Sequence, residues 1–352
     1  MKKSVLPFLC LFCVLAFSVS AMAEQPLPKV TILGTGGTIA GSAPSPAQLI
    51  GYKPGELTTE QLIATVPSLK EFAELSAEQI ANIDSADMTV DIWLHLARRI
   101  DALLSGETDG IVVTHGTDTL EETAYFLNLV VTSEKPVVIT GAMRPATAIS
   151  ADGPMNLLQA VAVAGSKEAR GKGVLVVMNG QINGARDVTK TSTIQPEAFQ
   201  SNDLGLLGYV VDNRPVFFRG SLRKHTTETE FNISDLDTLP KVAILYSYAD
   251  AGIDALSGIL AAGPDGIVVA GVGDGGISAK HRPILEEAAR QGIIVVRASR
   301  TGTGPVARIA TDEAAGFVAS GSLNPQKARV LLMLALSKTR DVKEVQRIFD
   351  SY

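Results

Sequence analysis

Short apolar runs rich in β-branched residues alternate with amphipathic segments along this chain. In the first half the runs lie at 30–33, 110–114, 136–140 and 174–178. Between them, large apolar residues recur at helical spacing, as in Trp93, Leu96, Ile100, Leu103 and Leu104. Continuous apolar strands separated by amphipathic helices are typical of a parallel sheet covered on both faces. The alternation therefore predicts an α/β fold.

A polar, charge-rich stretch at 219–239 interrupts this pattern, and we interpret it as a linker. Further apolar runs follow at 242–248, 266–270 and 293–298. Asn324-Pro325 then opens the last pair of helices, with Asn as the N-cap and Pro in the first turn. A length of 352 residues suits two domains. We expect an N-terminal domain at 24–218, a linker at 219–240 and a smaller C-terminal α/β domain at 241–352.

The first residues have the pattern of a secretory signal peptide. Lys2 and Lys3 give a charged start, and residues 5–19 are mostly apolar but too few to span a membrane comfortably. Ala21-Met22-Ala23 then forms a cleavage site. We expect residues 1–23 to be removed, which favours an exported protein without membrane attachment over one with an anchor helix.

Composition excludes several classes of function. Both cysteines, Cys10 and Cys13, lie in the expected leader, so the mature chain has no disulfide, thiol nucleophile or thiolate metal site. The net charge is −6, and no basic cluster of the kind that binds nucleic acid is present. The four histidines have no metal-ligand spacing. Of these, His95 is interpreted as structural.

In parallel sheets, ligands bind in the loops at the carboxyl ends of strands. Four loops of this chain qualify: 34–41 (GTGGTIAG), 114–119 (THGTDT), 140–144 (TGAMR) and 271–276 (GVGDGG). The first fails the dinucleotide pattern at Ile39 and lacks the Lys of a phosphate-binding loop. The last matches G-x-G-x-x-G, but Asp274 would repel a pyrophosphate. Tight strand-to-helix turns are therefore favoured over nucleotide binding.

Hydroxyl groups remain as candidate nucleophiles, since no G-x-S-x-G motif is present. Thr38 lies among glycines, which free backbone N–H groups to face an oxyanion. Thr117-Asp118 lies in a second turn at the same edge of the sheet. A threonine needs a base, and Lys190 would serve if a carboxylate such as Asp118 balanced its charge.

Simpler interpretations of the second turn stay open. Asp118 or Thr119 would cap the following helix, with Glu121 or Glu122 completing a capping box. His115, beside the turn, is more easily explained by hydrogen bonds to the loop backbone than as a catalytic base.

Five signatures link these turns to a known family. They are TILGTGGTIAG (31–41), GIVVTHGTDTLEETAYF (110–126), MRPATAISADGPMNL (143–157), DVTKT (187–191) and LNPQKARVLLMLAL (323–336). With them, the chain resembles the bacterial type II L-asparaginases of the asparaginase/glutaminase family over about 27–352.

The resemblance implies a flavodoxin-like N-terminal domain with a parallel sheet and a smaller α/β C-terminal domain. It implies a periplasmic homotetramer built from intimate dimers, with each active site between two subunits. The implied activity is hydrolysis of L-asparagine to L-aspartate and ammonia, with some action on L-glutamine. Neither a metal nor another cofactor is implied.

The resemblance also assigns roles to residues that match the family's motifs. Thr38 matches the nucleophile, and Thr35 is expected to shape the backbone. Tyr52 matches the tyrosine of a lid that lies in the Gly-, Pro- and Ser-rich stretch 41–58. Thr117, Asp118 and Lys190 match a triad that activates water.

Substrate binding is implied for the same edge of the sheet. Ser85, in Asp84-Ser85-Ala86, matches the serine that binds the substrate carboxylate. Its neighbour Asp84 is also expected to be a substrate-binding residue. Asp118 would hold the substrate ammonium. Backbone amides near Gly37 and Thr117 would stabilise the oxyanion. Ala86 stands where many relatives have glutamine or glutamate.

Two alternative functions stay open at this point. One is a glutaminase-asparaginase of broad specificity. The other is a non-catalytic periplasmic amino-acid-binding protein, which would also be exported, acidic and built from two α/β domains.

Overall fold

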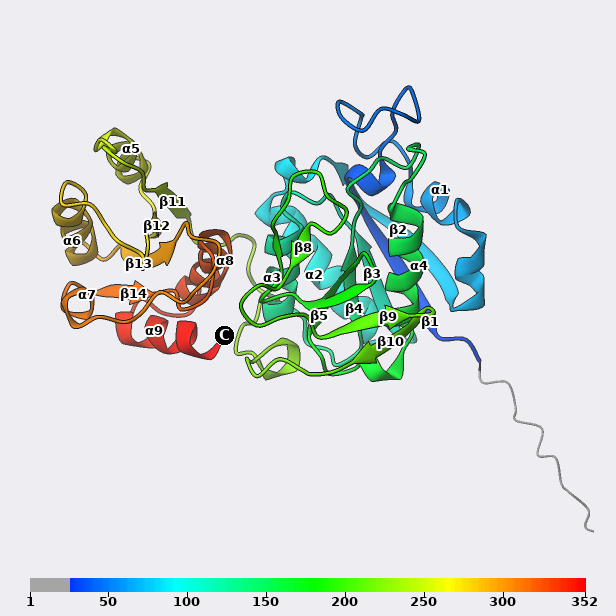
Figure 1. Ribbon diagram of the computed structural model, residues 1–352. Helices are drawn as coiled ribbons and strands as arrows, with labels where there is room; N and C mark the ends of the chain where they lie inside the picture. The colour runs from blue at the N-terminus through cyan, green and yellow to red at the C-terminus, as the bar shows by residue number, and fades with distance from the viewer. Residues whose placement is uncertain (1–25) are drawn as a thin grey trace, which may run out of the picture.

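The computed structural model describes residues 26–352, so the expected leader at 1–23 lies outside the described residues. Figure 1 shows two bodies side by side, each built on its own sheet. The predicted α/β architecture is therefore confirmed, with the larger sheet in the N-terminal part of the chain.

The N-terminal sheet has eight strands in the order β10-β9-β6-β5-β4-β3-β1-β2. Strands β1 to β5 pair in parallel, whereas β6, β9 and β10 join in antiparallel pairs. The strands are β1 (Lys29–Gly36), β2 (Glu74–Ile83), β3 (Gly110–Thr114), β4 (Val137–Thr140), β5 (Val174–Met178), β6 (Gln181–Gly184), β9 (Gly208–Val211) and β10 (Arg214–Phe217).

The sheet is thus parallel-rich, and it also contains the antiparallel strands β6, β9 and β10. The strands outside the predicted set lie toward the two edges. Strand β2 is an edge strand with partly exposed residues along its length, and it reads ELSAEQIANI. Strands β6, β9 and β10 contain four residues each. Strands that bury only one face lack the continuous apolar run by which a central strand is found.

Helices cover both faces of this sheet. One face packs against α2 (Val90–Leu104) and α3 (Leu120–Val130), and the other against α1 (Thr59–Ala64) and α4 (Gly153–Ala164). Successive residues of one strand point to opposite faces, so Leu33 packs on the first layer and Ile32 on the second. This two-sided burial is the reason that β1 and β3 are continuously apolar.

Helix α2 illustrates how local sequence sets these elements. Trp93, Leu96 and Ile100 are buried at helical spacing, which places one apolar stripe against the sheet. The Thr89 side chain caps the helix by accepting a hydrogen bond from the backbone N–H of Ile92.

The second sheet has four parallel strands, β11 (Val242–Tyr246), β12 (Gly266–Gly271), β13 (Ile294–Ser299) and β14 (Phe317–Ala319), in that order. The first three match predicted runs. The helices are α5 (Asp254–Ala261), α6 (Arg282–Arg290), α7 (Ala310–Ala314), α8 (Pro325–Leu336) and α9 (Val342–Ser351). As predicted, Asn324 caps α8 and Pro325 occupies its first turn.

Helix α8 links the two bodies. It packs on β11, β12 and α3, so buried residues from both bodies form one apolar cluster. Between the sheets, residues 219–240 carry one short 3-10 helix, η5 (Thr226–Glu228). The remaining short elements are β7 (Thr189–Lys190), β8 (Phe199–Gln200), η1 (Thr38–Ala40), η2 (Pro67–Glu71), η3 (Ser85–Asp87) and η4 (Lys167–Ala169).

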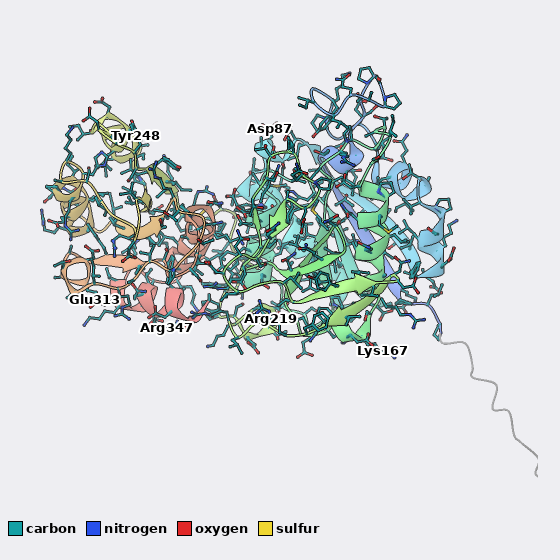
Figure 2. All side chains as sticks on the ribbon, viewed as in Figure 1. Asp87, Lys167, Arg219, Tyr248, Glu313 and Arg347 are labelled. Atoms are coloured by element: carbon teal, nitrogen blue, oxygen red, sulfur yellow. The ribbon has the colours of Figure 1, made fainter. Side chains whose placement is uncertain are left out.

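The carboxyl ends of the parallel strands lie at one end of the molecule. Figure 2 labels Asp87, which follows β2, and Tyr248, which follows β11, at this end of the two bodies. Lys167 and Arg347 are labelled at the opposite end. The loops singled out from the sequence therefore belong to one end of the fold.

Candidate active site

A cavity of about 600 Å³ opens at the carboxyl edge of β1 and β3. Its lining contains every residue that the sequence predicts for the site: Gly37, Thr38, Tyr52, Asp84, Ser85, Thr117, Asp118 and Lys190. These residues come from five separate stretches of chain. The fold therefore brings together the two glycine-rich turns, the 41–58 stretch, the segment after β2 and the short strand β7.

The first turn holds Thr38 at the start of η1, directly after β1. The Thr38 side chain is nearly buried, and its Oγ1 lies 2.6 Å from the hydroxyl of Tyr52. The other threonine of this turn has a different contact, because Thr35 Oγ1 donates to the backbone carbonyl of Thr114. Thr38 is therefore the hydroxyl presented to the cavity, and Thr35 joins β1 to β3.

The two turns approach each other so closely that only glycine fits. Gly37 has φ +80°, and a Cβ at this position would lie 2.2 Å from Gly116 Cα. The backbone N–H of Gly37 donates to Ile83 O at 2.9 Å, so this amide is not free to bind an oxyanion. The next N–H belongs to Thr38, the first residue of η1, where a helical turn leaves donors unpaired.

The second turn places Thr117 and Asp118 around the ammonium group of Lys190. Lys190 Nζ lies 2.9 Å from Thr117 Oγ1 and 2.5 Å from Asp118 Oδ1. The lysine side chain is 17% exposed, whereas the aspartate side chain is 61% exposed and faces the cavity. The carboxylate thus balances the lysine charge and still has an oxygen available for a second cation.

Ser85 ties the segment after β2 to the second turn. Its Oγ accepts a hydrogen bond from the Asp118 N–H at 3.2 Å, and its backbone carbonyl accepts one from Thr119 Oγ1 at 2.7 Å. Asp84 caps η3 by accepting from the Ala86 N–H. The serine hydroxyl proton is therefore the group that can donate to a ligand in the cavity.

The helix-cap alternative for the second turn is wrong. Thr119 is the N-cap residue of α3, but its side chain makes no capping hydrogen bond and binds Ser85 instead. Asp118 binds Lys190. Both side chains have long-range partners, which displace the local capping box.

His115 orients the peptide bond before Thr117. Its Nδ1 lies 2.7 Å from Gly116 O, and its Nε2 lies 2.9 Å from Thr123 Oγ1. The Thr123 oxygen itself accepts a hydrogen bond from Trp93 Nε1. A carbonyl only accepts, so Nδ1 carries the proton and Nε2 accepts from Thr123. The carbonyl and N–H of a trans peptide point in opposite directions. Fixing Gly116 O thus directs the Thr117 N–H away from the histidine.

Burial keeps this histidine uncharged. His115 is fully enclosed, and burial lowers its pKa to about 4 against the opposing effect of the Gly116 carbonyl. Of its two sequence interpretations, the structure shows the backbone-bound one.

Residues 193–196 and Met143 and Arg144 also line the cavity. The sequence singled out the 140–144 loop but not Thr193, Ile194, Gln195 and Pro196. No motif marks this second group, and it reaches the cavity only because it follows β7 in the chain.

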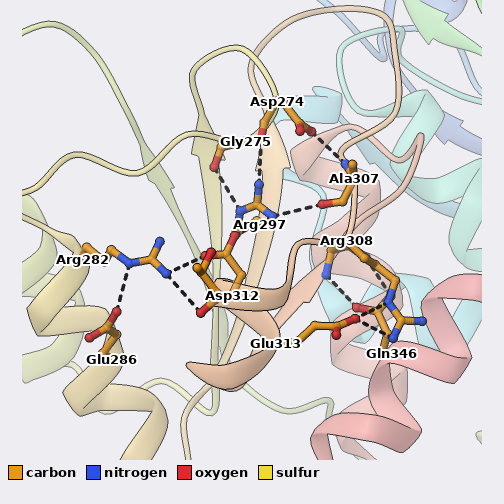
Figure 3. A network of polar contacts seen from close by, with 12 residues as sticks. Asp274, Gly275, Arg282, Glu286, Arg297, Ala307, Arg308, Asp312, Glu313 and Gln346 are labelled. Carbon is orange, nitrogen blue, oxygen red and sulfur yellow. Dashed lines mark hydrogen bonds and ion pairs between the residues drawn. The ribbon is translucent and has the colours of Figure 1, made fainter.

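The glycine motif at 271–276 lies in the other body and has a structural explanation. Figure 3 shows Arg297 donating to the carbonyls of Asp274, Gly275 and Ala307. The Asp274 carboxylate accepts from the Ala307 N–H at 2.8 Å. The motif precedes no helix until α6 at Arg282. It is therefore a tight turn, as the sequence favours.

Two further observations concern residues 26–352. This part of the chain contains no group of three or more His, Cys, Asp or Glu side chains arranged to hold a metal ion. It also contains no helix with the length and apolar character needed to cross a bilayer.

Comparison with known proteins is consistent with this geometry. The family described as asparaginase, N-terminal, matches residues 29–223, and the glutaminase/asparaginase C-terminal domain matches 241–349. The chain belongs to the asparaginase family. Together the two matches span both sheets, so the resemblance inferred from the sequence is confirmed over nearly all of the described chain.

Individual relatives align over their full lengths. The probable periplasmic L-asparaginase of Haemophilus influenzae is 51% identical, with 98% of each chain covered. L-asparaginase 2 of Escherichia coli is 48% identical, covering 100% of this chain and 99% of its own. A glutaminase-asparaginase of Pseudomonas fluorescens is 46% identical over both full chains.

A solved structure shares the fold as well. The crystal structure of a probable cytoplasmic L-asparaginase from Campylobacter jejuni superposes with a TM-score of 0.91 at 50% identity. It covers 92% of this chain and 100% of its own.

Proposed function

We propose that this protein is an L-asparaginase, an amidohydrolase that converts L-asparagine and water to L-aspartate and ammonia. One observation carries the proposal: two threonine hydroxyls line a single cavity, Thr38 beside Tyr52 and Thr117 beside Lys190. Relatives from Haemophilus influenzae and Escherichia coli carry the name L-asparaginase, which agrees with this activity.

In the first step, Thr38 Oγ attacks the side-chain carbonyl carbon of the substrate. A C–O bond forms, the C–N bond breaks, and the threonine proton leaves on the amide nitrogen as ammonia. The Tyr52 hydroxyl, 2.6 Å from Thr38 Oγ1, is close enough to relay that proton. The product of this step is an aspartyl ester on Thr38.

In the second step, water attacks the ester carbonyl and restores Thr38. One water proton returns to Thr38 Oγ, and the released acid ionises. The Thr117 hydroxyl, hydrogen-bonded to Lys190 Nζ, is the group that orients the water. The Asp118 carboxylate balances the charge of the Lys190 ammonium, so the lysine can remain beside the substrate.

Both steps create an oxyanion that needs hydrogen-bond donors. We assign this role to the backbone N–H groups of Thr38 and Thr117, which belong to the two facing turns. Removing one donor of this kind typically slows an enzyme about 10²- to 10³-fold. The contact of Gly116 O with His115 has catalytic relevance because it aims the Thr117 N–H.

The cavity also offers a charge of each sign for a zwitterionic amino acid. The exposed carboxylate of Asp118 is suited to the substrate ammonium. The Ser85 hydroxyl proton is suited to the substrate carboxylate, because its oxygen already accepts from Asp118 N. Asp84, which supports η3, is proposed to act through Ser85 rather than by touching substrate.

We further propose that residues 41–58 act as a lid. The segment is closed at its base by an antiparallel bridge between Ser42 and Lys53, and it carries Tyr52 into the cavity. Leu49 and Ile50 at its tip line the cavity yet remain exposed. Apolar residues in this position would be buried by closure over a bound substrate.

Ammonia release from L-asparagine by the purified mature chain is the direct test of the activity. A wild-type protein that binds L-asparagine in a thermal-shift assay but releases no ammonia would be an amino-acid-binding protein, and the hydrolase proposal would be wrong.

The nucleophile is tested by Thr38→Ala. We expect turnover of L-asparagine to fall by at least about 10³-fold, as for loss of other catalytic nucleophiles. The melting temperature should stay close to wild type, because a single small side chain is shortened. Thr35→Ser is the matched control, since it keeps the hydroxyl that binds Thr114 O and should retain activity. Unchanged turnover in Thr38→Ala would contradict the assignment.

Substrate preference separates the two enzymatic alternatives. We propose that L-glutamine is a poorer substrate than L-asparagine. Relatives carry both names, L-asparaginase and glutaminase-asparaginase, so the names do not decide the matter. Equal kcat/KM values for the two amides would establish a glutaminase-asparaginase of broad specificity.

Export to the periplasm is a further part of the proposal. It is supported by the sequence of residues 1–23 and by the word periplasmic in the name of the Haemophilus influenzae relative. Cell fractionation combined with N-terminal sequencing tests it. A cytoplasmic protein that retains Met1 would contradict it.

We also propose that the chain assembles as a homotetramer. Large apolar side chains are exposed near the carboxyl edge of the second sheet, including Tyr246, Tyr248, Ile253 and Val272. Such groups favour a protein partner, and a second copy would cover them. Light scattering should give four times the mass of the mature chain, and a monomeric mass would overturn the proposal.

A further inference from the structure

The strand that carries Lys190 is held by few backbone hydrogen bonds to other strands. Strand β7 contains two residues and pairs only with the equally short β8. The Lys190 ammonium nevertheless sits at hydrogen-bond distance from both Thr117 and Asp118. Something other than the main sheet must therefore fix the backbone of this residue.

Part of the support comes from Glu121, in the first turn of α3. Its side chain is 4% exposed, and Oε2 accepts a hydrogen bond from the Lys190 backbone N–H at 3.1 Å. The other oxygen, Oε1, accepts from the side chains of Gln326 and Asn324. One carboxylate thus connects the helix behind the second turn, the lysine strand and the start of α8.

The rest comes from Lys327 in α8, which is 2% exposed. Its Nζ donates to the carbonyl of Arg186 at 2.8 Å and to that of Val188. Both carbonyls lie within the four residues before Lys190. Helix α8 belongs to the C-terminal body, so the lysine strand is held from across the boundary between the two bodies.

The charged groups facing Lys327 come from two parts of the chain. They are Glu121 and Glu122 of α3, and Arg186 and Asp187 before β7. Burial lowers the pKa of Lys327 to about 8, and the carboxylates of Glu121 and Asp187 oppose that effect.

Stability alone is a weak reason for two charged side chains in this interior. Desolvating charges is unfavourable, and apolar side chains of similar size often stabilise an interior equally well. Apolar side chains, however, form no directional hydrogen bonds that could hold a backbone group in place. Glu121 and Lys327 each bind the backbone here, and together they fix three backbone groups around Lys190, namely its own N–H and the carbonyls of Arg186 and Val188.

We propose that Lys327 and Glu121 form a clamp across the two bodies that positions the Lys190 ammonium between Thr117 and Asp118. The two are positioning residues, since neither lines the cavity. The C-terminal body of the same chain is thereby required for the chemistry of the N-terminal site. This inference rests on the proposed amidohydrolase activity.

The test uses Lys327→Met, which keeps most of the length of the side chain and removes the donors. Misplacing a catalytic group by about 1 Å can cost on the order of 10²-fold in rate. We expect kcat for L-asparagine to fall about 10- to 100-fold, with KM changed less than about threefold, because Ser85, proposed to bind the substrate carboxylate, is untouched.

A matched control exists at the far end of the same helix. Lys338 follows α8 and binds Glu230 through its Nζ, away from the cavity. Lys338→Met removes an amine of the same kind and should leave kcat and KM as in wild type. A folded Lys327→Met protein with the kcat of Lys338→Met would overturn the proposal, as would a raised KM with unchanged kcat.

A second variant keeps the test decisive if Lys327→Met does not fold. Gln326→Ala removes only one hydrogen bond to Glu121 and should lower kcat several-fold. Wild-type kcat in this folded variant would then count against the clamp. A crystal structure of either variant gives a readout independent of activity, because Lys190 Nζ should move away from Thr117 Oγ1. If the wild type released no ammonia, the proposed function would fail, while this displacement would still test the clamp.

Discussion

At some positions of this site, the available space restricts the residue type as much as the chemistry does. Gly37 and Gly116 bring the two turns into backbone contact, and this contact sets Thr38 and Thr117 at the same cavity. A larger residue at either glycine would separate the hydroxyl groups. The nucleophile's environment therefore depends on two residues that have no side chain.

Gly37→Ala tests this dependence. Its Cβ would lie 2.2 Å from Gly116 Cα, so one turn must move. We expect turnover to fall by about 10²-fold or more, since a shift near 1 Å is enough for such a loss. Gly171→Ala is the matched control: it also has positive φ, +65°, but its Cβ would meet nothing within 4 Å. That variant should lose only about 1 kcal/mol of stability and keep its activity. Wild-type kcat in Gly37→Ala would contradict this account.

His115 predicts an acid-dependent loss of stability. Burial lowers its pKa from 6.5 to about 4, so the unfolded chain takes up a proton at a higher pH than the folded chain does. The stabilisation is complete above pH 6.5 and is lost as pH falls through about 4. It amounts to about 3 kcal/mol at most. Urea unfolding at several pH values should show this slope in the wild type and a weaker slope in His115→Gln. Equal slopes would exclude this histidine as the source.

At the scale of elements, charged side chains hold loops that lack a strand or helix of their own. Arg297 of β13 binds three loop carbonyls, and its guanidinium pairs with Asp312 of α7 at 2.7 Å (Figure 3). Asp312 also pairs with Arg282 of α6. The network thus joins strand β13 to helices α6 and α7 and to the loops between them.

Breaking this network should be costly. Arg297 and Asp312 are each 4% exposed at the side chain, so Asp312→Asn leaves a buried guanidinium without its counter-charge. We expect a loss of about 3–5 kcal/mol in the free energy of unfolding, measured with urea. Glu287→Gln breaks the exposed pair with Arg290 and should cost less than about 1 kcal/mol. A loss in Asp312→Asn no larger than in this control would refute the structural role.

At the scale of the whole molecule, the segment between the two sheets is fastened to the end of the chain. Glu230 accepts hydrogen bonds from Arg347 of α9 and from Lys338, and Tyr352 Oη donates to the same carboxylate. The Tyr352 ring packs on Phe231 with ring centres 5.1 Å apart. The C-terminal residues thus help to fix how the two bodies are joined.

Glu230 makes the stability of this connection depend on pH, in a lower pH range than His115 does. Burial alone would raise its pKa, but Arg347 and Lys338 outweigh it and hold the pKa at about 2. The stabilisation is therefore complete above pH 4.5 and is lost as pH falls toward 2. Allowing for partial exposure, it is worth about 1–2 kcal/mol. Glu230→Gln should lose this slope in thermal melts between pH 4.5 and 2, whereas the exposed Glu228→Gln should keep it. An unchanged slope in Glu230→Gln would contradict the assignment.

The sequence by itself determined the elements whose signals are local. Central strands such as β1 and β3 are buried on both faces, and this burial makes them continuously apolar. Asn324 and Pro325 predicted the start of α8 because capping involves neighbouring residues only. The glycines around Thr38 marked a strand-end turn with a presented hydroxyl, and the family motifs named the residues that line the cavity.

Only the tertiary structure decided which of these residues meet. Lys190 reaches Thr117 across 73 positions of the chain, and spacing carries no information about such a contact. The same long-range contacts explain why the predicted helix cap is wrong. The Thr119 side chain binds Ser85, and the Asp118 side chain binds Lys190, so neither caps the helix. The clamp of Lys327 and Glu121 joins two bodies, so it exists only once both have folded and docked.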